Sequence, residues 1–267
     1  MPSKKKRHLR RYLWLLPVIG IGLLLLQPRW LFTLAARVKP GAIYAVDLPK
    51  TGPKVVALTI DDGPSKDTLE ILEVLDRYDA KATFFSISDN VPSHEGAIAQ
   101  TIQSGHELGN HLTADEPSIR LSKTEFEADL NRAESVLAPY MPQKELKWLR
   151  PGMGFYSTEM VKTANHRGYQ LALGSVFPYD THIPSENFAI AFILNTIQPG
   201  DIIVLHDGEK GSRSQRTIAT LEKVLPALAE KGYQVTTLSE LVQQADLETS
   251  LQADRTTRPY RTSGDRS

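Results

Sequence analysis

The sequence predicts an α/β protein, an irregular (β/α) barrel of about seven parallel strands with an N-terminal hydrophobic anchor or signal segment. Short apolar runs alternate with amphipathic stretches, which is the pattern of strands joined by helices. Polar residues cluster directly after several of the apolar runs. A length of 267 residues suits one such barrel with short extensions. An open doubly wound sheet has the same alternation, so the sequence leaves closure of the barrel undecided.

The N-terminal region has the pattern of an export segment. Residues 1–11 form a basic cluster that we expect to remain in the cytoplasm, and the apolar run YLWLLPVIGIGLLLL covers 12–26. A second apolar patch, Trp30–Ala36, follows Arg29. Residues 12–36 are long enough for a membrane anchor if Arg29 snorkels, and the alternative is a signal peptide that is cleaved near Ala36. Both interpretations place the rest of the chain outside the cytoplasm.

Three further segments follow along the chain. Residues 37–53 contain three prolines and are predicted to be a linker. Residues 54–245 carry the alternating pattern and are predicted to be the catalytic domain. Residues 246–267 are polar and aperiodic, which predicts a disordered tail. Since the barrel begins near Lys54, we expect a chain lacking residues 1–36 to be soluble and active.

The charge and cysteine content exclude several classes of partner and site. Six Lys and Arg residues precede Tyr12, and without them 25 basic residues remain against 31 acidic ones. Such a body repels a phosphate backbone, so nucleic acid is excluded as a partner, whereas a neutral glycan is compatible. Cysteine is absent, so any metal is held by nitrogen and oxygen ligands. The sequence does not fix the oligomeric state.

The predicted elements follow from local patterns. Seven runs have the character of strands: 55–60, 82–87, 106–110, 147–150, 170–175, 201–206 and 234–238. Seven stretches have that of helices: 68–78, 94–104, 123–137, 157–167, 185–197, 215–231 and 239–244. Ser122 and Glu125 have the spacing of a capping box, and Gly232 is a suitable helix C-cap. The strands are therefore expected to be parallel, with right-handed crossovers.

Polar residues at the C-terminal ends of these strands mark the expected site. They are Asp61 and Asp62 after the first strand, His111 after the third, Arg150 after the fourth, Asp180 after the fifth, and His206 and Asp207 after the sixth. Barrels of this class build their active sites on that face. These side chains are therefore expected to converge although they lie far apart in sequence.

The segment Thr59-Ile60-Asp61-Asp62-Gly63-Pro64 resembles the first motif of the polysaccharide deacetylases of the NodB homology domain, carbohydrate esterase family 4. The resemblance implies that Asp61 is the catalytic base and that Asp62 is a metal ligand. Two adjacent carboxylates at a strand end need a cation to tolerate each other, which agrees with this assignment. The alternative is a simple turn, because Asp-Asp-Gly-Pro is also favourable turn chemistry.

The segment Gly105–His111 resembles the second motif of that family, which implies that His111 is a metal ligand. The family has a second histidine four residues later, and this chain has Asp115 there. Carboxylates ligate divalent cations at similar distances, so we expect Asp62, His111 and Asp115 to hold Zn, Mn or Co. The alternative is that Asp115 caps the loop, with Glu116 or water in the site.

Arg150-Pro151-Gly152-Met153-Gly154 resembles the third motif. The resemblance implies that Arg150 orients Asp61 and that the backbone N–H of Met153 binds the oxyanion. An arginine that only forms a salt bridge is the alternative.

The remaining two motifs supply the expected acid. Residues 175–181 resemble the fourth motif, which implies that Asp180 pairs with the catalytic histidine, although Thr181 replaces the usual tryptophan and removes one wall of the pocket. Residues 201–207 resemble the fifth motif, which implies that His206 is the general acid and that Leu205 touches the acetyl methyl group. A nearby carboxylate raises the pKa of an imidazole, so Asp180 is expected to favour the protonated acid.

The resemblance implies metal-dependent hydrolysis of N-acetyl groups on an exported amino-sugar polysaccharide, such as peptidoglycan or a chitin-like glycan. A first alternative is a deacetylase of the same fold that acts on O-acetyl esters or non-sugar amides, which the loss of the tryptophan at Thr181 favours. A second is an inactive, exported glycan-binding protein in which Asp115 fails to complete the metal site. Retention of Asp61, Arg150, Asp180 and His206 argues against it, since a binding module needs no acid–base pair.

Overall fold

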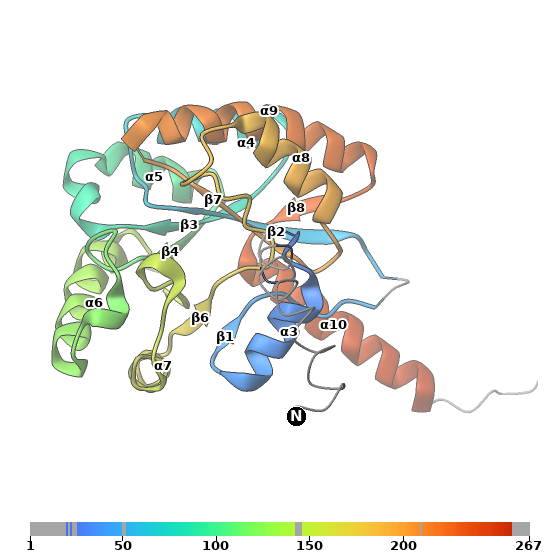
Figure 1. Cartoon of the computed structure of the whole chain (residues 1–267), viewed down its shortest axis with the longest axis horizontal. Helices are drawn as coiled ribbons and strands as arrows, with labels where there is room; N and C mark the ends of the chain where they lie inside the picture. The colour runs from blue at the N-terminus through green and yellow to red at the C-terminus, as the bar shows by residue number, and fades with distance from the viewer. Residues whose placement is uncertain are drawn as a thin grey trace, which may run out of the picture.

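The fold is a curled, entirely parallel β-sheet that is covered by helices (Figure 1). The computed structural model describes residues 26–49, 52–141, 146–208 and 210–257, together with Gly20 and Gly22. The predicted basic cluster 1–11 and most of the apolar run 12–26 lie outside the described residues. Among the described helices, none has the length and apolar character that crossing a bilayer requires.

The sheet contains all seven predicted strands and one short strand that was not predicted. Its order is β1-β6-β5-β4-β3-β2-β7, with β8 also paired to β2. The strands are β1 (Ala42–Ile43), β2 (Val55–Asp61), β3 (Ala82–Ser86), β4 (Glu107–Asn110), β5 (Trp148–Leu149), β6 (Gln170–Ala172), β7 (Ile202–His206) and β8 (Gln234–Thr236). Beyond β6, Val176 forms a parallel bridge to Ile203 of β7. The sheet therefore curls into an irregular partial barrel, which confirms the predicted class.

The helices largely match the sequence patterns. They are α3 (Arg29–Val38), α4 (Thr68–Arg77), α5 (Glu95–Gln103), α6 (Lys123–Leu137), α7 (Thr158–His166), α8 (Glu186–Thr196), α9 (Arg213–Glu230) and α10 (Leu238–Thr257). The predicted capping box at Ser122 and Glu125 is present at the start of α6. In Figure 1, α4, α8 and α9 lie together on one side of the sheet, with α6 and α7 on the other.

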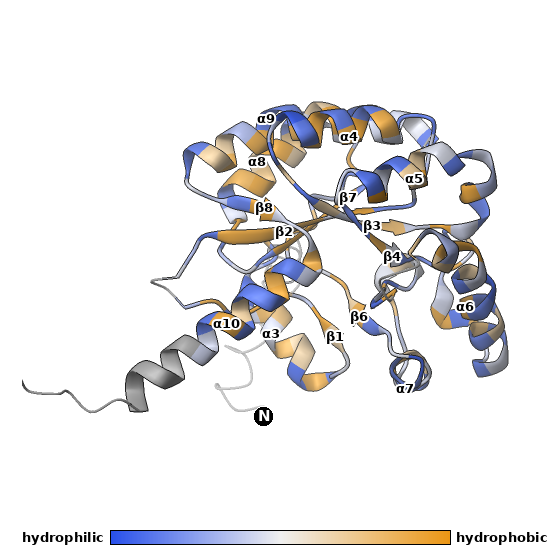
Figure 2. Cartoon of the chain, turned by 180° about the vertical axis from the view of Figure 1, so that it is seen from behind, coloured by the Kyte–Doolittle hydropathy of each residue, from blue (hydrophilic) through white to orange (hydrophobic). Residues whose placement is uncertain are grey.

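The side chains of β2 alternate between two hydrophobic cores, one on each face of the sheet. All seven residues of β2 are buried. Val56, Leu58 and Ile60 belong to the core beneath α4 and α9, whereas Val55 and Ala57 pack inside the curl with Leu238 and Leu241 of α10. Each fully buried Leu, Ile or Val contributes about 1.5–3 kcal/mol. Figure 2 shows β2 coloured as hydrophobic and α6 as largely hydrophilic. Asp61 continues the face of Val55 and Ala57, so it points into the curl.

The fold extends beyond the predicted domain 54–245 at both ends. Within 37–53, predicted to be a linker, β1 pairs with β6 in parallel register. Val46 donates its backbone N–H to the carbonyl of Gly200 at 2.8 Å. Gly200 has a φ of +83°, and a Cβ there would lie 1.9 Å from the Val46 carbonyl oxygen. Only glycine allows this approach. At the other end, α10 runs to Thr257 and so enters the predicted tail, of which residues 258–267 lie outside the described residues.

Candidate active site

The predicted polar residues converge at the C-terminal ends of the parallel strands. Asp61 of β2 and His206 of β7 are direct register partners. A cavity of about 640 Å³ lies against them, and its lining includes seven of the eight residues for which we predicted acid–base, metal or oxyanion roles. Those that line it are Asp61, Asp62, His111, Asp115, Arg150, Met153 and His206. Asp180 lies behind His206 and is described below.

Asp61 is held by a buried ion pair with Arg150. The Nη1 atom of Arg150 lies 2.6 Å from Asp61 Oδ1 and also donates to Thr59 Oγ1 at 2.8 Å. Its Nε atom donates to the Ala172 carbonyl at 2.8 Å, and the guanidinium lies 4.1 Å from the centroid of the Phe85 ring. Burial lowers the pKa of Arg150, and Asp61 opposes this effect. The arginine therefore has few other positions available, and Asp61 is fixed with it.

His206 is paired with Asp180. Its Nδ1 atom lies 2.9 Å and 3.1 Å from the two carboxylate oxygens, and its backbone N–H donates to Asp180 Oδ2 at 3.0 Å. Burial lowers the pKa of His206, but Asp180, Asp61 and Asp62 outweigh burial and raise it to about 9. The imidazole is therefore protonated at neutral pH and is suited to act as an acid.

Asp62 contacts both His111 and Arg213. His111 Nε2 lies 3.4 Å from Asp62 Oδ1, and Arg213 Nη1 forms an ion pair with Asp62 Oδ2. Burial raises the pKa of Asp62, but His111, His206 and Arg213 outweigh it and lower the pKa to about 2. Arg213 begins α9, 151 residues from Asp62 along the chain, and no motif of the sequence indicated this contact.

Asp62 and His111 fit a divalent cation, and the placement of Asp115 differs from theirs. The Nδ1 atom of His111 lies 2.6 Å from the Arg150 carbonyl, which leaves Nε2 toward Asp62, as second-shell contacts do for metal-binding histidines. Asp115 lines the same cavity, but its carboxylate lies 3.9 Å from Lys210. In the described ranges, no three His, Cys, Asp or Glu side chains form a group that could hold a metal ion.

Replacing Arg213 with alanine is expected to tighten binding of Zn²⁺ or Mn²⁺ by about 10-fold or more, because the guanidinium competes with the metal for Asp62. Tenfold corresponds to about 1.4 kcal/mol. Two unit charges 4 Å apart repel by about 4 kcal/mol at an effective dielectric constant of 20. Isothermal titration calorimetry measures the dissociation constants.

Arg216→Ala is the matched control for that variant. Arg216 lies one turn further along α9 and donates to the backbone carbonyls of Gly211 and Asp180 rather than to Asp62. Its removal is expected to leave metal affinity unchanged. Equal affinities in the two variants would show that Arg213 does not compete with the metal.

Met153 and Leu205 occupy different environments. Met153 lines the cavity and has a φ of 62° in the turn Gly152–Gly154. Leu205 is fully buried in the core beneath α9, whereas its neighbour Val204 lines the cavity beside His206. Successive side chains of a strand point to opposite faces, so Leu205 cannot share a face with His206. Val204 therefore takes the place in the cavity that we expected for Leu205.

Backbone strain is concentrated at the motifs. Four non-glycine residues in or beside them have a positive φ: Asp62 (70°), Leu112 (64°), Met153 (62°) and Tyr179 (56°). Such conformations cost of the order of 1–3 kcal/mol each and occur mainly at functional sites. These strained residues belong to the loops that carry the motifs, as is typical of functional sites.

Asp207 holds the loop that follows Asp62 through buried hydrogen bonds. Its carboxylate accepts hydrogen bonds from Ser65 Oγ at 2.5 Å and from Thr68 Oγ1, and its backbone N–H donates to the Asp61 carbonyl at 2.7 Å. Burial raises the pKa of Asp207, and these hydroxyl groups oppose the effect. Asp207 thus fixes the loop after Asp62, a function that its position beside His206 in the sequence did not indicate.

The N-terminal segment supplies part of the cavity wall, which the sequence interpretation missed. Leu31 and Phe32 of α3 and Tyr44, just after β1, line the cavity. The rings of Phe32 and Tyr44 have centroids 5.8 Å apart. Thr181, where the family has a tryptophan, lines it as well. The cavity therefore has aromatic side chains from a segment that we predicted to be anchor and linker.

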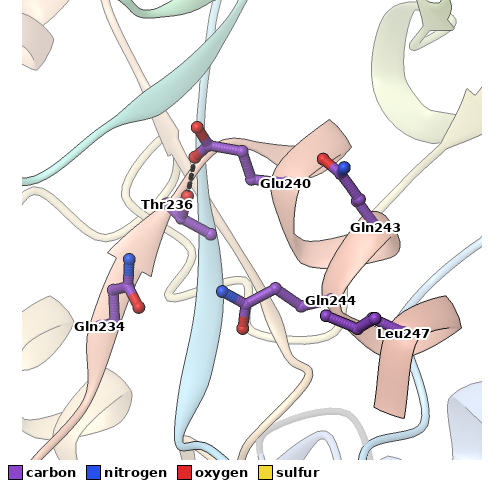
Figure 3. A pocket seen from close by; sticks show the side chains of 6 residues that line it. All are labelled: Gln234, Thr236, Glu240, Gln243, Gln244 and Leu247. Carbon is purple, nitrogen blue, oxygen red and sulfur yellow. Dashed lines mark hydrogen bonds between the residues drawn. The ribbon is translucent and has the colours of Figure 1, made fainter. Parts of the chain in front are cut away.

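A second hollow lies between β8 and α10, away from the motif residues (Figure 3). It is lined by Gln234, Thr236, Glu240, Gln243, Gln244 and Leu247. Thr236 donates its hydroxyl to the carboxylate of Glu240. This hollow contains amide side chains and one carboxylate but no acid–base pair.

Comparisons with known proteins agree with this geometry. Residues 49–172 match the family model described as polysaccharide deacetylase. The chain is 34% identical over 192 residues to a peptidoglycan-N-acetylglucosamine deacetylase of Bacillus cereus, covering 71% of this chain and 88% of the relative. It is 28% identical over 199 residues to a chitooligosaccharide deacetylase of Sinorhizobium fredii, covering 71% and 93%.

A solved structure extends the comparison to the fold. The wild-type pseudoenzyme of the CE4 family from Bacillus anthracis superposes with a TM-score of 0.68 and 26% identity, covering 77% of this chain and 70% of that one. The match to the family model, the extent of the B. cereus alignment and the shared fold all point the same way. The chain therefore belongs to the polysaccharide deacetylase family, carbohydrate esterase family 4.

Proposed function

We propose that this protein removes N-acetyl groups from an amino-sugar polysaccharide, with peptidoglycan or a chitin-like glycan as substrate. The observation that carries the proposal is the pair formed by Asp61 and His206. The two residues are register partners on adjacent strands, and both are buried. One is held by Arg150 and the other by Asp180. A buried base beside a protonated acid is the arrangement that hydrolysis of an amide requires.

In this proposal, Asp61 takes a proton from the attacking water while the new C–O bond forms at the acetyl carbon. The backbone N–H of Met153 stabilises the oxyanion of the tetrahedral intermediate. His206 then gives its Nε2 proton to the departing nitrogen as the C–N bond breaks, leaving acetate and a free amino sugar. Asp180 holds the imidazole through Nδ1 and stabilises its protonated form.

Asp62 and His111 would hold a divalent cation, Zn, Mn or Co, with Asp115 as the third ligand. When bound, this cation supplies Lewis-acid polarisation of the acetyl carbonyl. Nitrogen and oxygen donors suit all three metals. For Asp115 to become a ligand beside Asp62 and His111, its carboxylate must move away from Lys210. The side chain of Arg213 must also move away from Asp62 or share its carboxylate with the cation.

Each of the two proposed substrates appears in the name of a relative, so the relatives support deacetylation of a glycan but do not decide between the two substrates. The B. cereus relative is named for peptidoglycan and the S. fredii relative for chitooligosaccharides. We further propose that the protein is exported and held at the membrane, with release after signal cleavage as the alternative. Because residues 29–36 of the predicted anchor 12–36 belong to α3, which lines the cavity, the apolar run 12–26 is the part that we propose to hold the membrane. The apolar run and the preceding basic cluster support this location.

Two other functions rest on specific observations. Thr181 stands where the family has a tryptophan, which favours a different acyl group, such as an O-acetyl ester or a non-sugar amide. The similarity to a CE4 pseudoenzyme and the position of Asp115 favour an inactive glycan-binding protein. The intact pair of Asp61 with Arg150 and of His206 with Asp180 weighs against inactivity.

Acetate release from purified full-length protein tests the proposal directly. We expect release from N-acetylated chitooligosaccharides or from peptidoglycan, and loss of activity on treatment with a chelator, with recovery on adding Zn²⁺, Mn²⁺ or Co²⁺. Acetate from acetylated xylan alone would favour the ester alternative. No acetate from any substrate, with retained glycan binding, would favour the binding protein and refute hydrolysis.

A further inference from the structure

Helix α3 is fixed to the catalytic body by polar contacts at its start. Gln27 Nε2 donates to the Phe177 carbonyl at 2.7 Å, and the Phe177 N–H donates to Gln27 Oε1 at 3.0 Å. Arg29 donates to the carbonyls of Pro199 at 2.6 Å and Val46 at 2.7 Å. Its guanidinium also lies 3.6 Å from the buried carboxylate of Asp201. These contacts reach the loop before Asp180 and the start of β7, so they set the orientation of α3 relative to the active site.

Helix α3 has a polar strip, and its apolar side chains continue from the covered side of the helix onto the exposed side. Leu31 and Phe32 face the catalytic cavity. Trp30, Leu34 and Val38, spaced four residues apart on the other face, have exposures of 56%, 50% and 76%. We call these three side chains the outer stripe. Large apolar side chains that lie in line on the exposed side of a helix commonly mark a site of interaction with a membrane or a partner. The outer stripe is therefore a candidate for a site of this kind.

The chain itself indicates what covers the outer stripe. The apolar run 12–26 ends three residues before α3 begins at Arg29. Arg37 lies exposed in the last turn of α3, beside the stripe. Tryptophan and leucine flanked by arginine are typical of helices that lie in the interfacial plane of a bilayer. Three side chains also present far less than the ~800 Å² per partner of a stable protein interface.

Building on the membrane location proposed above, we propose that the outer stripe of α3 is embedded in the interfacial region of a lipid bilayer, so that the catalytic cavity opens beside the membrane surface. One face of the helix binds lipid while the other forms the cavity wall. The contacts of Gln27 and Arg29 fix α3 to the body, so the orientation of the helix at the membrane also sets the orientation of the cavity. The glycan that reaches the cavity is then one that lies within reach of the membrane surface.

Tryptophan fluorescence of the full chain tests this inference without relying on catalysis. The sequence has three tryptophans, at positions 14, 30 and 148. In a Trp14→Phe chain, Trp30 is exposed and Trp148 has an exposure of 0%. The chain is reconstituted in vesicles of phosphatidylethanolamine and phosphatidylglycerol, with and without bromine on the upper part of the acyl chains. We expect brominated lipid to quench Trp30 and to leave Trp148 unaffected.

Two further variants separate the possible outcomes. Trp30→Phe in the same background is expected to abolish the quenching, since only Trp148 remains. Leu34→Ser with Val38→Ser is expected to reduce it, with kcat/KM on a soluble oligosaccharide unchanged, because neither residue lines the cavity. Equal emission from Trp30 in brominated and plain vesicles would overturn the inference. A blue-shifted but unquenched Trp30 would do so too, since residues 12–25 or a second copy would then cover the stripe.

Discussion

Asp61→Asn is expected to lower kcat by at least about 10²-fold, because it removes the base while it preserves the shape of the side chain. The ion pair with Arg150 is also lost. Breaking a buried pair costs about 3–5 kcal/mol of stability when one charge is left uncompensated. Arg150 keeps its contacts with the Ala172 carbonyl, Thr59 and Phe85, so we expect a loss at the lower end of that range. Initial rates of acetate release and thermal unfolding midpoints measure the two effects.

Thr59→Val is the matched control for Asp61→Asn. It removes the other side-chain acceptor of Arg150 Nη1 and leaves the carboxylate of Asp61 in place. We expect its kcat to fall far less than that of Asp61→Asn. If a folded Asp61→Asn protein retained wild-type kcat, Asp61 would not be the base. If both variants lost activity equally, the role of the pair would be structural.

Asp180→Asn is expected to move the alkaline limit of activity to lower pH and to reduce kcat/KM strongly at pH 8. The general acid must carry a proton, so activity falls as pH rises through the pKa of His206, which is about 9. Asp180 raises that pKa, against the opposing effect of burial. Removing its charge therefore lowers the pKa, by about one unit or more. We expect the alkaline limb of the pH–activity profile near pH 9 in the wild type and at about pH 8 or lower in Asp180→Asn.

Titration of the His206 imidazole by NMR checks this assignment independently of turnover. The wild type is expected to titrate well above the ordinary histidine value of about 6.5. His94 hydrogen-bonds the Asn90 carbonyl outside the catalytic cavity, and its resonance serves as an internal reference that Asp180→Asn does not shift. A wild-type His206 that titrates near or below 6.5 would contradict the assigned acid.

The elements that the sequence predicted well are those with strong local signals. The predicted strand 55–60 is a largely apolar run, and α6 begins at a capping box, so neither depends on distant residues. β1 has two residues and owes its existence to pairing with β6, so no period is visible in it. α3 is rich in apolar residues and follows the apolar run 12–26 closely, so its sequence was interpreted as part of a membrane anchor.

The site residues also divide into those that a local sequence motif identified and those whose role depends on the fold. The motifs identified Asp61, His206, Arg150 and Asp180 through the family resemblance, and the fold brings them together. Arg213 could not be found, because its contact with Asp62 depends on how α9 meets β2. The placement of Leu205 was within reach of the sequence, because a residue adjacent to His206 on a strand faces the opposite way.

The position of α3 has a consequence for where the chain can be shortened. Cutting the chain after Ala36, whether by a signal peptidase or by cloning, would remove Gln27, Arg29 and Phe32. From these contacts we now expect such a chain to be less active than the full chain. The buried carboxylate of Asp201 would lose its cation, and the cavity would lose one wall. A soluble version is better started at Leu26, with polar residues replacing the exposed apolar side chains of α3. Any chain that begins at Leu26 or earlier keeps the contacts of Gln27 and Arg29 and the cavity wall formed by α3.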